Sequence, residues 1–440
     1  MEVAIKIIQF LLSLSILIVI HELGHFLAAR YFNTRVEKFY LFFNPWFSIF
    51  KKKIGDTEYG LGWLPLGGYV KISGMIDESM DKEQMKQPPQ PWEFRTKPAW
   101  QRLIVMLGGV TFNVILAIVI YIMMLFFVGE KYLPAQNARY GIVADSLALE
   151  IGLQTGDKIL FINQEPIDDF MEIPRHFILG NARTVGVERN GELLTLEVPE
   201  GFFARIISAR GANFMSLRFP FIAHGFTKES VAEQAGVLVG DHIMGINEIE
   251  TWSFDEFRAI IGNYAGQDIE LLVLRNGEKL HLPMSVPEEG LIGVYLEPLD
   301  NLFDFQQKEY SFLAAIPAGA VKAWRTTVNY ISELRLLFRP EVKASESLGG
   351  FITIGSIFAP TWDWLHFWSI TAFLSIILAI MNILPIPALD GGHVMFLMYE
   401  IIVGRKPSEK FMEYAQTVGM ILLLGLIIFA QYNDIMRLFR

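Results

Sequence analysis

The chain has 440 residues, of which 52% are hydrophobic and 19% are charged. This composition is too apolar for an ordinary soluble protein of that length. The formal charge of −10 argues against a nucleic-acid partner, because no basic stripe offsets it. The absence of cysteine excludes a disulfide framework and thiolate metal ligands. We therefore expect a protein embedded in a lipid bilayer.

Four apolar stretches predict transmembrane helices. Residues 7–20 carry no charge but reach bilayer thickness only if the helix continues to about Ala29. Residues 103–128 and 365–389 provide 26 and 25 residues, enough to cross about 30 Å of hydrocarbon. A fourth candidate runs from about Ala415 to Gln431. The first stretch is interpreted as a retained helix, because it lacks the basic cluster and the cleavage site of a signal peptide.

The distribution of basic residues predicts the orientation of these helices. Twelve Lys and Arg residues lie between positions 30 and 102, and Arg405, Lys406 and Lys410 lie between the last two stretches. Both connections should therefore be cytoplasmic, which places the long middle segment on the opposite side.

A metal-binding motif, His21-Glu22-Leu23-Gly24-His25, ends the first apolar stretch. Two His residues four apart lie one turn apart on a helix, so both imidazoles can hold one ion, and the Glu can reach a water on that ion. A catalytic zinc needs a third protein ligand as well as an open position. Taken alone, the motif could still arise by chance.

The third apolar stretch offers that ligand in Asn382-Ile-Leu-Pro385-Ile-Pro387-Ala-Leu-Asp390-Gly-Gly-His393. A carboxylate within a transmembrane segment costs roughly 2.5–3.5 kcal/mol and is expected to have a partner. Two imidazoles, one carboxylate and one hydroxide neutralise Zn²⁺, so we expect Asp390 to be the third ligand. His393 is the competing ligand, and a helix C-cap formed by Asp-Gly-Gly is the structural alternative.

An internal repeat occupies the polar middle of the chain. Residues 144–157 align with residues 228–241 at an offset of 84. The residues that recur are Ser146, Ala148, Gly152, Gly156, Asp157, Ile159, Ile162 and Asn163, which return as Ser230, Ala232, Gly236, Gly240, Asp241, Ile243, Ile246 and Asn247. Further on, Arg189-Asn-Gly-Glu192 returns as Arg275-Asn-Gly-Glu278, a pattern typical of a hairpin turn.

Each copy resembles a PDZ domain of the bacterial protease type, and we assign residues 130–210 and 211–299 to the two domains. PDZ domains bind an extended peptide at a sheet edge, and Gly290-Leu-Ile-Gly-Val294 looks like a loop for its carboxylate. Two structural domains without a peptide ligand are the alternative. In the segment 300–362, predicted to form amphipathic linker helices, an apolar helical face is formed by Val321, Trp324, Val328 and Ile331, followed by Leu334 and Phe338. This face could lie on the outer leaflet or pack against the repeats.

Together the HELGH motif, the Asn382–Gly391 motif and the tandem repeats resemble the RseP-like bacterial site-two intramembrane zinc metalloproteases. The resemblance covers essentially the whole chain. It implies that His21, His25 and Asp390 bind zinc and that Glu22 is the general base. It further implies that Asn382, with Pro385 and Pro387 shaping the backbone, engages the substrate. The chain departs from the family at Gly108-Gly109 and Gly349-Gly350, where relatives commonly have Gly-Pro.

The implied fold is a membrane α-helical bundle of four transmembrane helices with a membrane-associated β-hairpin at about residues 50–75, plus two α+β PDZ domains in tandem. Residues 1–129 and 363–440 would form the bundle, in the inner membrane of a bacterium, with the PDZ domains in the periplasm and the active site toward the cytoplasm. The hairpin residues Gly67, Gly68 and Tyr69 would bind substrate, unless the hairpin only rests on the membrane.

Implied substrates are single-span membrane proteins, such as pre-cleaved anti-sigma-factor-like regulators and remnant signal peptides. The PDZ domains would exclude bulky ectodomains by size or bind a truncated ectodomain or peptide terminus. The rival hypotheses are a catalytically silent PDZ membrane scaffold and a transporter. The transporter is disfavoured because no inverted repeat of the spans is apparent.

Overall fold

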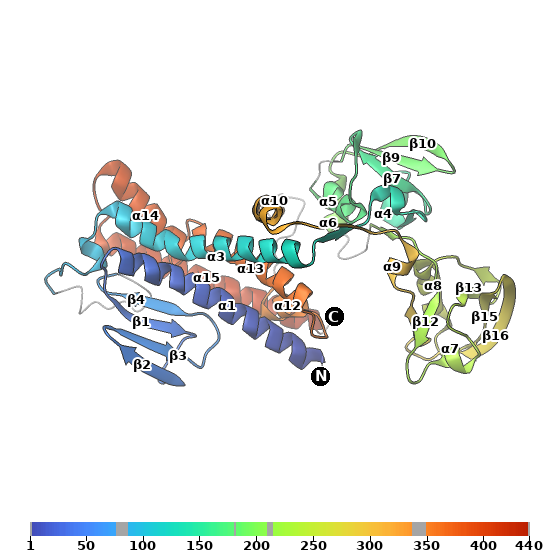
Figure 1. Cartoon of the computed structure of the whole chain (residues 1–440), viewed down its shortest axis with the longest axis horizontal. Helices are drawn as coiled ribbons and strands as arrows, with labels where there is room; N and C mark the ends of the chain where they lie inside the picture. Colours follow the sequence, from blue (N-terminus) through green and yellow to red (C-terminus); the bar gives the residue numbers. More distant parts are fainter. Residues whose placement is uncertain (1, 76–86, 180–181, 209–213, 337–348, 439–440) are drawn as a thin grey trace. The chain divides into compact units, whose positions relative to one another are not determined.

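The structure, a computed structural model, describes residues 2–75, 87–179, 182–208, 214–336 and 349–438. The chain forms two compact units. The membrane unit contains the described residues of 2–129 and 309–438, and the repeat unit contains those of 130–308. Figure 1 labels the elements of both units.

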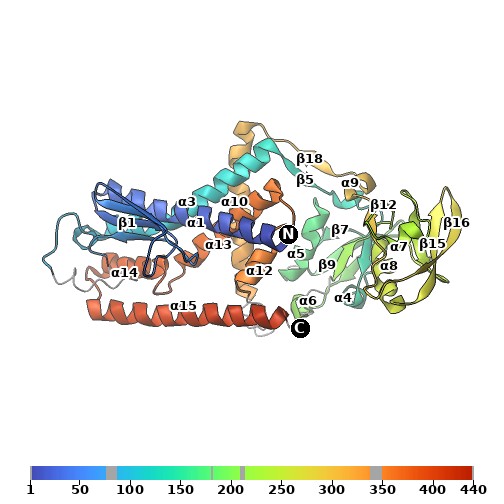
Figure 2. The ribbon, with the colours of Figure 1, turned by 90° about the horizontal axis from the view of Figure 1, so that it is seen from below.

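Four helices of the described residues are long and apolar enough to cross a membrane. They are α1 (Glu2–Tyr31), α3 (Ala99–Phe127), α13 (Trp364–Ile383) and α15 (Glu409–Leu438). They run lengthwise through the membrane unit (Figures 1 and 2). Helix α13 stops six residues before the predicted end of the third span, because Pro385 and Pro387 cannot continue an α-helix. The four predicted spans are otherwise confirmed as apolar helices.

Helices α1 and α3 approach each other closely at glycines. A methyl group at Gly24 would lie 2.2 Å from the carbonyl oxygen of Gly108, and one at Gly108 would lie 2.5 Å from the carbonyl oxygen of Gly24. Small residues of this kind let helix backbones touch in a bilayer, where the hydrophobic effect does not drive association. Polar contacts join α13 to both of these helices. Thr371 of α13 donates to the hydroxyl of Ser13 on α1, and Ser375 donates to a backbone carbonyl of α3.

A four-stranded sheet packs beside α1, where the sequence predicted only a hairpin (Figure 1). Its strands are β1 (Val36–Leu41), β2 (Phe50–Ile54), β3 (Thr57–Leu61) and β4 (Tyr69–Ile72), in the order β2-β3-β1-β4. Strands β2 and β3 form an antiparallel hairpin over residues 50–61. The expected hairpin does not continue through Gly67, Gly68 and Tyr69, because β4 pairs antiparallel with the unpredicted β1, which also pairs parallel with β3. Strand β4 is therefore an edge strand, with β1 as its neighbour in the sheet.

The other helices among the described residues of the membrane unit are the 3-10 turn η1 (Phe94–Thr96), α10 (Phe312–Leu336), α12 (Phe351–Ser356) and α14 (Asp390–Val403). Helix α10 runs across the long helices (Figure 2). Its buried face is formed by small residues, including Ala315 and Ala323, and Gly319 packs against Ile122 of α3. The predicted apolar face, including Trp324, is exposed on the membrane unit. Contact of this face with lipid stays a prediction, and Phe338 lies outside the described residues.

The repeat unit begins and ends with a pair of strands, β5 (Glu130–Tyr132) and β18 (Gln306–Lys308). The first copy contains η2 (Ala135–Asn137), β6 (Ile142–Ala144), α4 (Ser146–Glu150), β7 (Lys158–Ile162), β8 (Glu165–Pro166), η3 (Phe170–Glu172), α5 (Ile173–Ile178), β9 (Thr184–Arg189), β10 (Glu192–Glu197), α6 (Phe202–Ser208) and β11 (Met215–Leu217). The second contains β12 (Ala223–Phe226), α7 (Val231–Gln234), β13 (His242–Ile246), β14 (Ile249–Glu250), α8 (Phe254–Ile261), η4 (Gly262–Tyr264), β15 (Asp268–Arg275), β16 (Glu278–Ser285), β17 (Val294–Leu296) and α9 (Leu299–Leu302).

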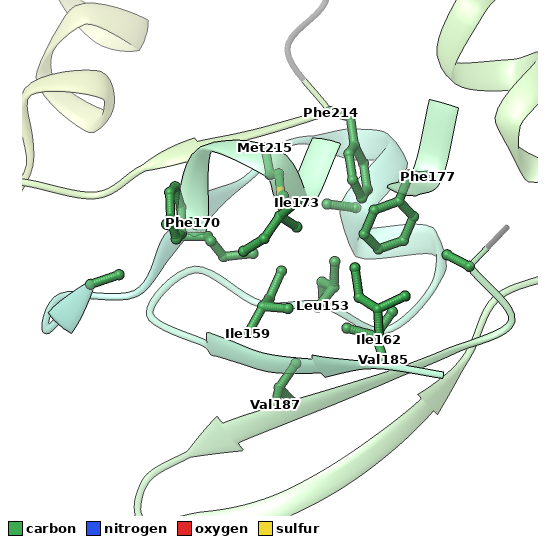
Figure 3. Close-up of a cluster of buried hydrophobic side chains, with 14 of the residues drawn as sticks. Leu153, Ile159, Ile162, Phe170, Ile173, Phe177, Val185, Val187, Phe214 and Met215 are labelled. Atoms are coloured by element: carbon green, nitrogen blue, oxygen red, sulfur yellow. The ribbon is translucent and has the colours of Figure 1, made fainter. Parts of the chain in front are cut away.

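Both copies have the same strand order. The sheet β10-β9-β7-β8 corresponds to β16-β15-β13-β14, and the pair β11-β6 corresponds to β17-β12. Each copy encloses a core of its own. In the first, Ile159, Val187, Phe177 and Phe214 converge between sheet and helices (Figure 3). Because β11 pairs with β6, the first copy extends to Leu217, beyond the boundary at residue 210 that the sequence suggested.

An Asp-Arg pair explains why the same residues recur in both copies. Arg189 donates two hydrogen bonds of 2.7 Å to Asp157, and Arg275 donates bonds of 2.8 and 2.7 Å to Asp241. Each Asp also accepts a backbone N–H bond of 2.8 Å from the preceding turn. The recurring Asn-Gly pairs have positive φ at both residues, as the predicted hairpin turns require.

Candidate metal centre

Three potential ligands converge inside the membrane unit. His21 and His25 lie one turn apart on α1 and are 8% and 7% exposed. Their Nε2 atoms lie 3.2 Å from each other, and 3.1 and 3.3 Å, respectively, from Oδ2 of Asp390, the first residue of α14. The predicted trio is thus brought together across some 370 residues of sequence. His393 lines the same cavity but does not belong to this cluster.

The spacing of these atoms fits a tetrahedral zinc site. Zinc bonds of about 2.0–2.1 Å imply ligand atoms about 3.3–3.4 Å apart, close to the three distances found. The Asp390 Oδ2 atom is buried and accepts no hydrogen bond from the described residues. A buried anionic oxygen facing two imidazole lone pairs needs a cation between them. The residues present therefore fit zinc.

Helix α3 fixes how both imidazoles present their Nε2 atoms. His25 Nδ1 lies 2.8 Å from the carbonyl oxygen of Val105, which can only accept, so Nδ1 carries the proton and Nε2 keeps its lone pair. The amide nitrogen of Asn113 lies 3.2 Å from His21 Nδ1, while the amide oxygen is buried without a partner among the described residues. Turning the amide end for end satisfies this oxygen, which then accepts from Nδ1–H and leaves the second Nε2 equally free. This role of Asn113 was not predicted, although an amide within an uncharged span was a usable signal.

The imidazoles also require a glycine on α3. A methyl group at Gly109 would lie 2.4 Å from His25 Nε2 and 2.6 Å from His21 Cε1. The ligand rings therefore lie directly against the backbone of α3, where only a glycine leaves room. Gly108-Gly109, noted in the sequence as a departure from the family, forms this wall.

A proline-bearing loop, residues 384–389, places the third ligand. Asp390 begins α14, so it lies outside the predicted third span, and the alternative of a helix C-cap formed by Asp-Gly-Gly is wrong. Ala388 has φ +83°, which turns the chain into the new helix. Methyl groups at Gly391 and Gly392 would lie 2.1 and 2.7 Å from carbonyl oxygens of this loop, those of Leu384 and Ile386. The glycines after Asp390 thus allow α14 to start against the loop.

A cavity of about 520 Å³ opens beside the three ligands. Its lining includes Glu22, Asn382, and Gly67, Gly68 and Tyr69 at the start of β4, but neither Pro385 nor Pro387. The Asn382 amide nitrogen lies 3.4 Å from His21 Nε2. The cavity thus brings together the predicted base, ligands and substrate-contacting residues, with the two prolines confined to shaping the loop.

The edge strand β4 touches the predicted base. Val70 of β4 lines the cavity together with Glu22. A methyl group at Gly68 would lie 2.5 Å from Ile18 and 3.4 Å from Glu22 Cγ. Strand β4 therefore approaches α1 backbone-first, next to the HELGH motif.

Comparison with known proteins agrees with this geometry. Residues 9–426 match peptidase family M50. The chain is 30% identical to a Campylobacter jejuni protein named "Putative zinc metalloprotease Cj1068", over 99% of this chain and 94% of that protein. It is 28% identical to the Regulator of sigma E protease of Haemophilus influenzae, over 98% of each. The chain therefore belongs to peptidase family M50 and is a membrane zinc metalloprotease.

Proposed function

We propose that the protein is an intramembrane endopeptidase that cleaves peptide bonds within transmembrane segments of single-span membrane proteins. The observation that carries this proposal is the position of the His21-His25-Asp390 cluster inside a unit built from four membrane-spanning helices, beside the free edge of β4. A soluble protease would not need to hold its metal ligands on such helices.

Glu22 acts as the general base and acid. Zinc, when bound, polarises the scissile carbonyl and lowers the pKa of the attacking water. The Glu22 carboxylate takes a proton from that water and passes a proton to the departing amine. Asn382 lies close enough to His21 Nε2 to donate to the carbonyl being attacked.

Strand β4 receives the substrate as an added strand. A transmembrane helix has its carbonyls hydrogen-bonded internally, so cleavage requires a local unwound stretch with new partners. The unpaired edge of β4 provides backbone donors and acceptors in the cavity that Glu22 also lines. The glycines before β4 let the backbones approach at this point. Pre-cleaved anti-sigma-factor-like regulators and remnant signal peptides are the substrates that fit an unwound single span. The name of the Haemophilus influenzae relative, Regulator of sigma E protease, is in line with a regulatory substrate.

The two copies in the repeat unit are PDZ domains that filter substrates. In the second copy β12 pairs with β17 on one side, which leaves the other edge of β12 for a peptide. The Gly290–Gly293 loop precedes β17. With the repeat unit in the periplasm and the β1–β4 sheet on the cytoplasmic side, as the basic residues predict, a bulky ectodomain would be held away from the site.

The test is cleavage of a single-span substrate by reconstituted protein, with and without the substrate ectodomain. Glu22→Gln should lower the cleavage rate by about 10²–10⁴-fold while zinc content stays at the wild-type level. Cleavage by the wild type should require loss of the ectodomain. Zinc-loaded wild type that cleaves no substrate would favour the silent PDZ scaffold, whereas a Glu22→Gln protein that cleaves normally would remove this carboxylate from the mechanism.

A further inference from the structure

An amide on the fourth spanning helix also lines the cavity. Gln416 of α15 is 8% exposed. It shares the cavity with Glu22, Asn382 and Asp390. The structure gives its side chain no hydrogen bond to any described residue, and its polar atoms are not among those completely enclosed by protein. What remains accessible of this amide therefore opens into the cavity.

The location is costly for a polar side chain without a partner. Leaving a buried amide unsatisfied costs about 1–3 kcal/mol, and polar groups within a membrane bundle usually serve a function. No other amide side chain occurs on α15 until Gln431. The α15 helix is held at this point, because a methyl group at Gly419 would lie 2.9 Å or less from Pro387 atoms. Residues three apart share a helix face, so this contact keeps Gln416 turned toward the loop that carries Asp390.

We propose that Gln416 binds the backbone of the unwound substrate segment, a role that rests on the proposed function. A strand added to β4 has the backbone groups of one edge satisfied, while those of its other edge point away from the sheet. A Gln side chain offers both a donor and an acceptor, so it can pair with an N–H and a C=O of that second edge. Such a contact is independent of substrate sequence.

Disulfide cross-linking tests this placement without depending on turnover. The chain has no cysteine, so Gln416→Cys in the Glu22→Gln background introduces a single thiol. The partner is a single-span substrate with one cysteine in the segment to be cleaved. Val70→Cys on β4 is the reference, and Gln431→Cys, on the same helix but away from the cavity lining, is the matched control. We expect cross-links from positions 416 and 70 and at least ten-fold less from position 431.

The outcomes separate the two proposals. A cross-link from position 70 but none from position 416 would leave the β4 proposal standing and overturn the role of Gln416. Cross-links from neither position would overturn strand addition, and the role of Gln416 with it. Equal cross-linking from 416 and 431 would show that the substrate does not select the cavity side of α15, and this too would overturn the inference.

Kinetics provide an independent measurement. Gln416→Leu keeps the size of the side chain but removes both hydrogen-bonding groups, so kcat/KM for the single-span substrate should fall about 3- to 10-fold. Zinc content should not change, and Gln431→Leu should keep the wild-type kcat/KM. Wild-type kcat/KM in Gln416→Leu, or a loss of zinc from it, would contradict a substrate-binding role.

Discussion

Two mostly buried aspartates, one in each unit, differ in where their partners come from. Asp241 in the repeat unit receives two bonds from Arg275 and one from the backbone N–H of Leu238. Asp390 in the membrane unit has a buried Oδ2 that accepts no hydrogen bond from the described residues and instead faces two imidazoles. A buried carboxylate whose partners all belong to the chain is structural. One that lacks them requires a ligand from outside.

The largest effect should come from closing the space around the imidazoles. Gly109→Ala places a methyl group 2.4 Å from His25 Nε2, so the ligand rings must move and zinc binding should weaken by more than about 100-fold. Zinc titration of the purified variant measures this. Gly425→Ala, on α15 with no atom within 4 Å of the added methyl group, is the control and should bind zinc normally. Normal zinc affinity in Gly109→Ala would mean that the site is not formed against α3.

The structural aspartate should affect folding and leave the metal unchanged. Burial raises the pKa of the Asp241 carboxyl, but bonds from Arg275 and the Leu238 N–H outweigh burial and hold the pKa below its usual range. Arg275→Gln should therefore lower the free energy of unfolding of the repeat unit by about 2–3 kcal/mol at pH 7. This stabilisation is complete above the unfolded pKa of about 3.9 and disappears as the pH falls through the lower folded value.

Hydrogen exchange of the β13 and β15 amides in the whole protein, at pH 7 and in acid, would follow this loss. Lys279→Gln breaks an exposed pair with Glu250 and should cost at most about 0.5 kcal/mol. Equal effects of the two substitutions would contradict the structural role of Asp241, and so would a loss of zinc from Arg275→Gln.

A smaller effect is expected for the residue that orients one imidazole. Asn113→Leu removes the amide beside His21 Nδ1 and puts an apolar side chain of similar size in its place on α3. Zinc affinity should fall about 10- to 100-fold, and the affinity is best measured by competition with a chelator. Ser375→Ala removes a different polar contact of α3 and should not alter zinc binding. If both variants bound zinc equally well, Asn113 would have no part in fixing the imidazole.

The sequence predicted local features well. The HELGH pair, the four apolar helices and the repeat with its Asn-Gly turns all depend on residues close in the chain, where helical and strand periodicities operate. The approach of Asp390 to the two imidazoles was also predicted, because a carboxylate in an apolar stretch demands a partner. The position of Asp390 at the start of a new helix was not predicted, because the sequence stays apolar through residues 384–389 although Pro385 and Pro387 end the helix.

Non-local pairing accounts for most of what was missed. Strand β1 lies between β3 and β4 and pairs parallel with β3. No turn signal in the sequence marks a parallel pairing of this kind. Val105, Asn113 and Gly109 act on the imidazoles from α3, and nothing in their local sequence indicates that α1 lies against them. The same holds for Gln416, which joins the cavity from α15.

The most direct measurement is the zinc content of wild type, Asp390→Ala and Asp241→Ala, purified and dialysed in parallel. If two imidazoles on the first helix and a carboxylate on α14 share one cation, the wild type should retain one zinc per chain. Asp390→Ala should then lose it, and Asp241→Ala should keep it despite a destabilised repeat unit. Full zinc retention by Asp390→Ala would contradict the three-ligand centre.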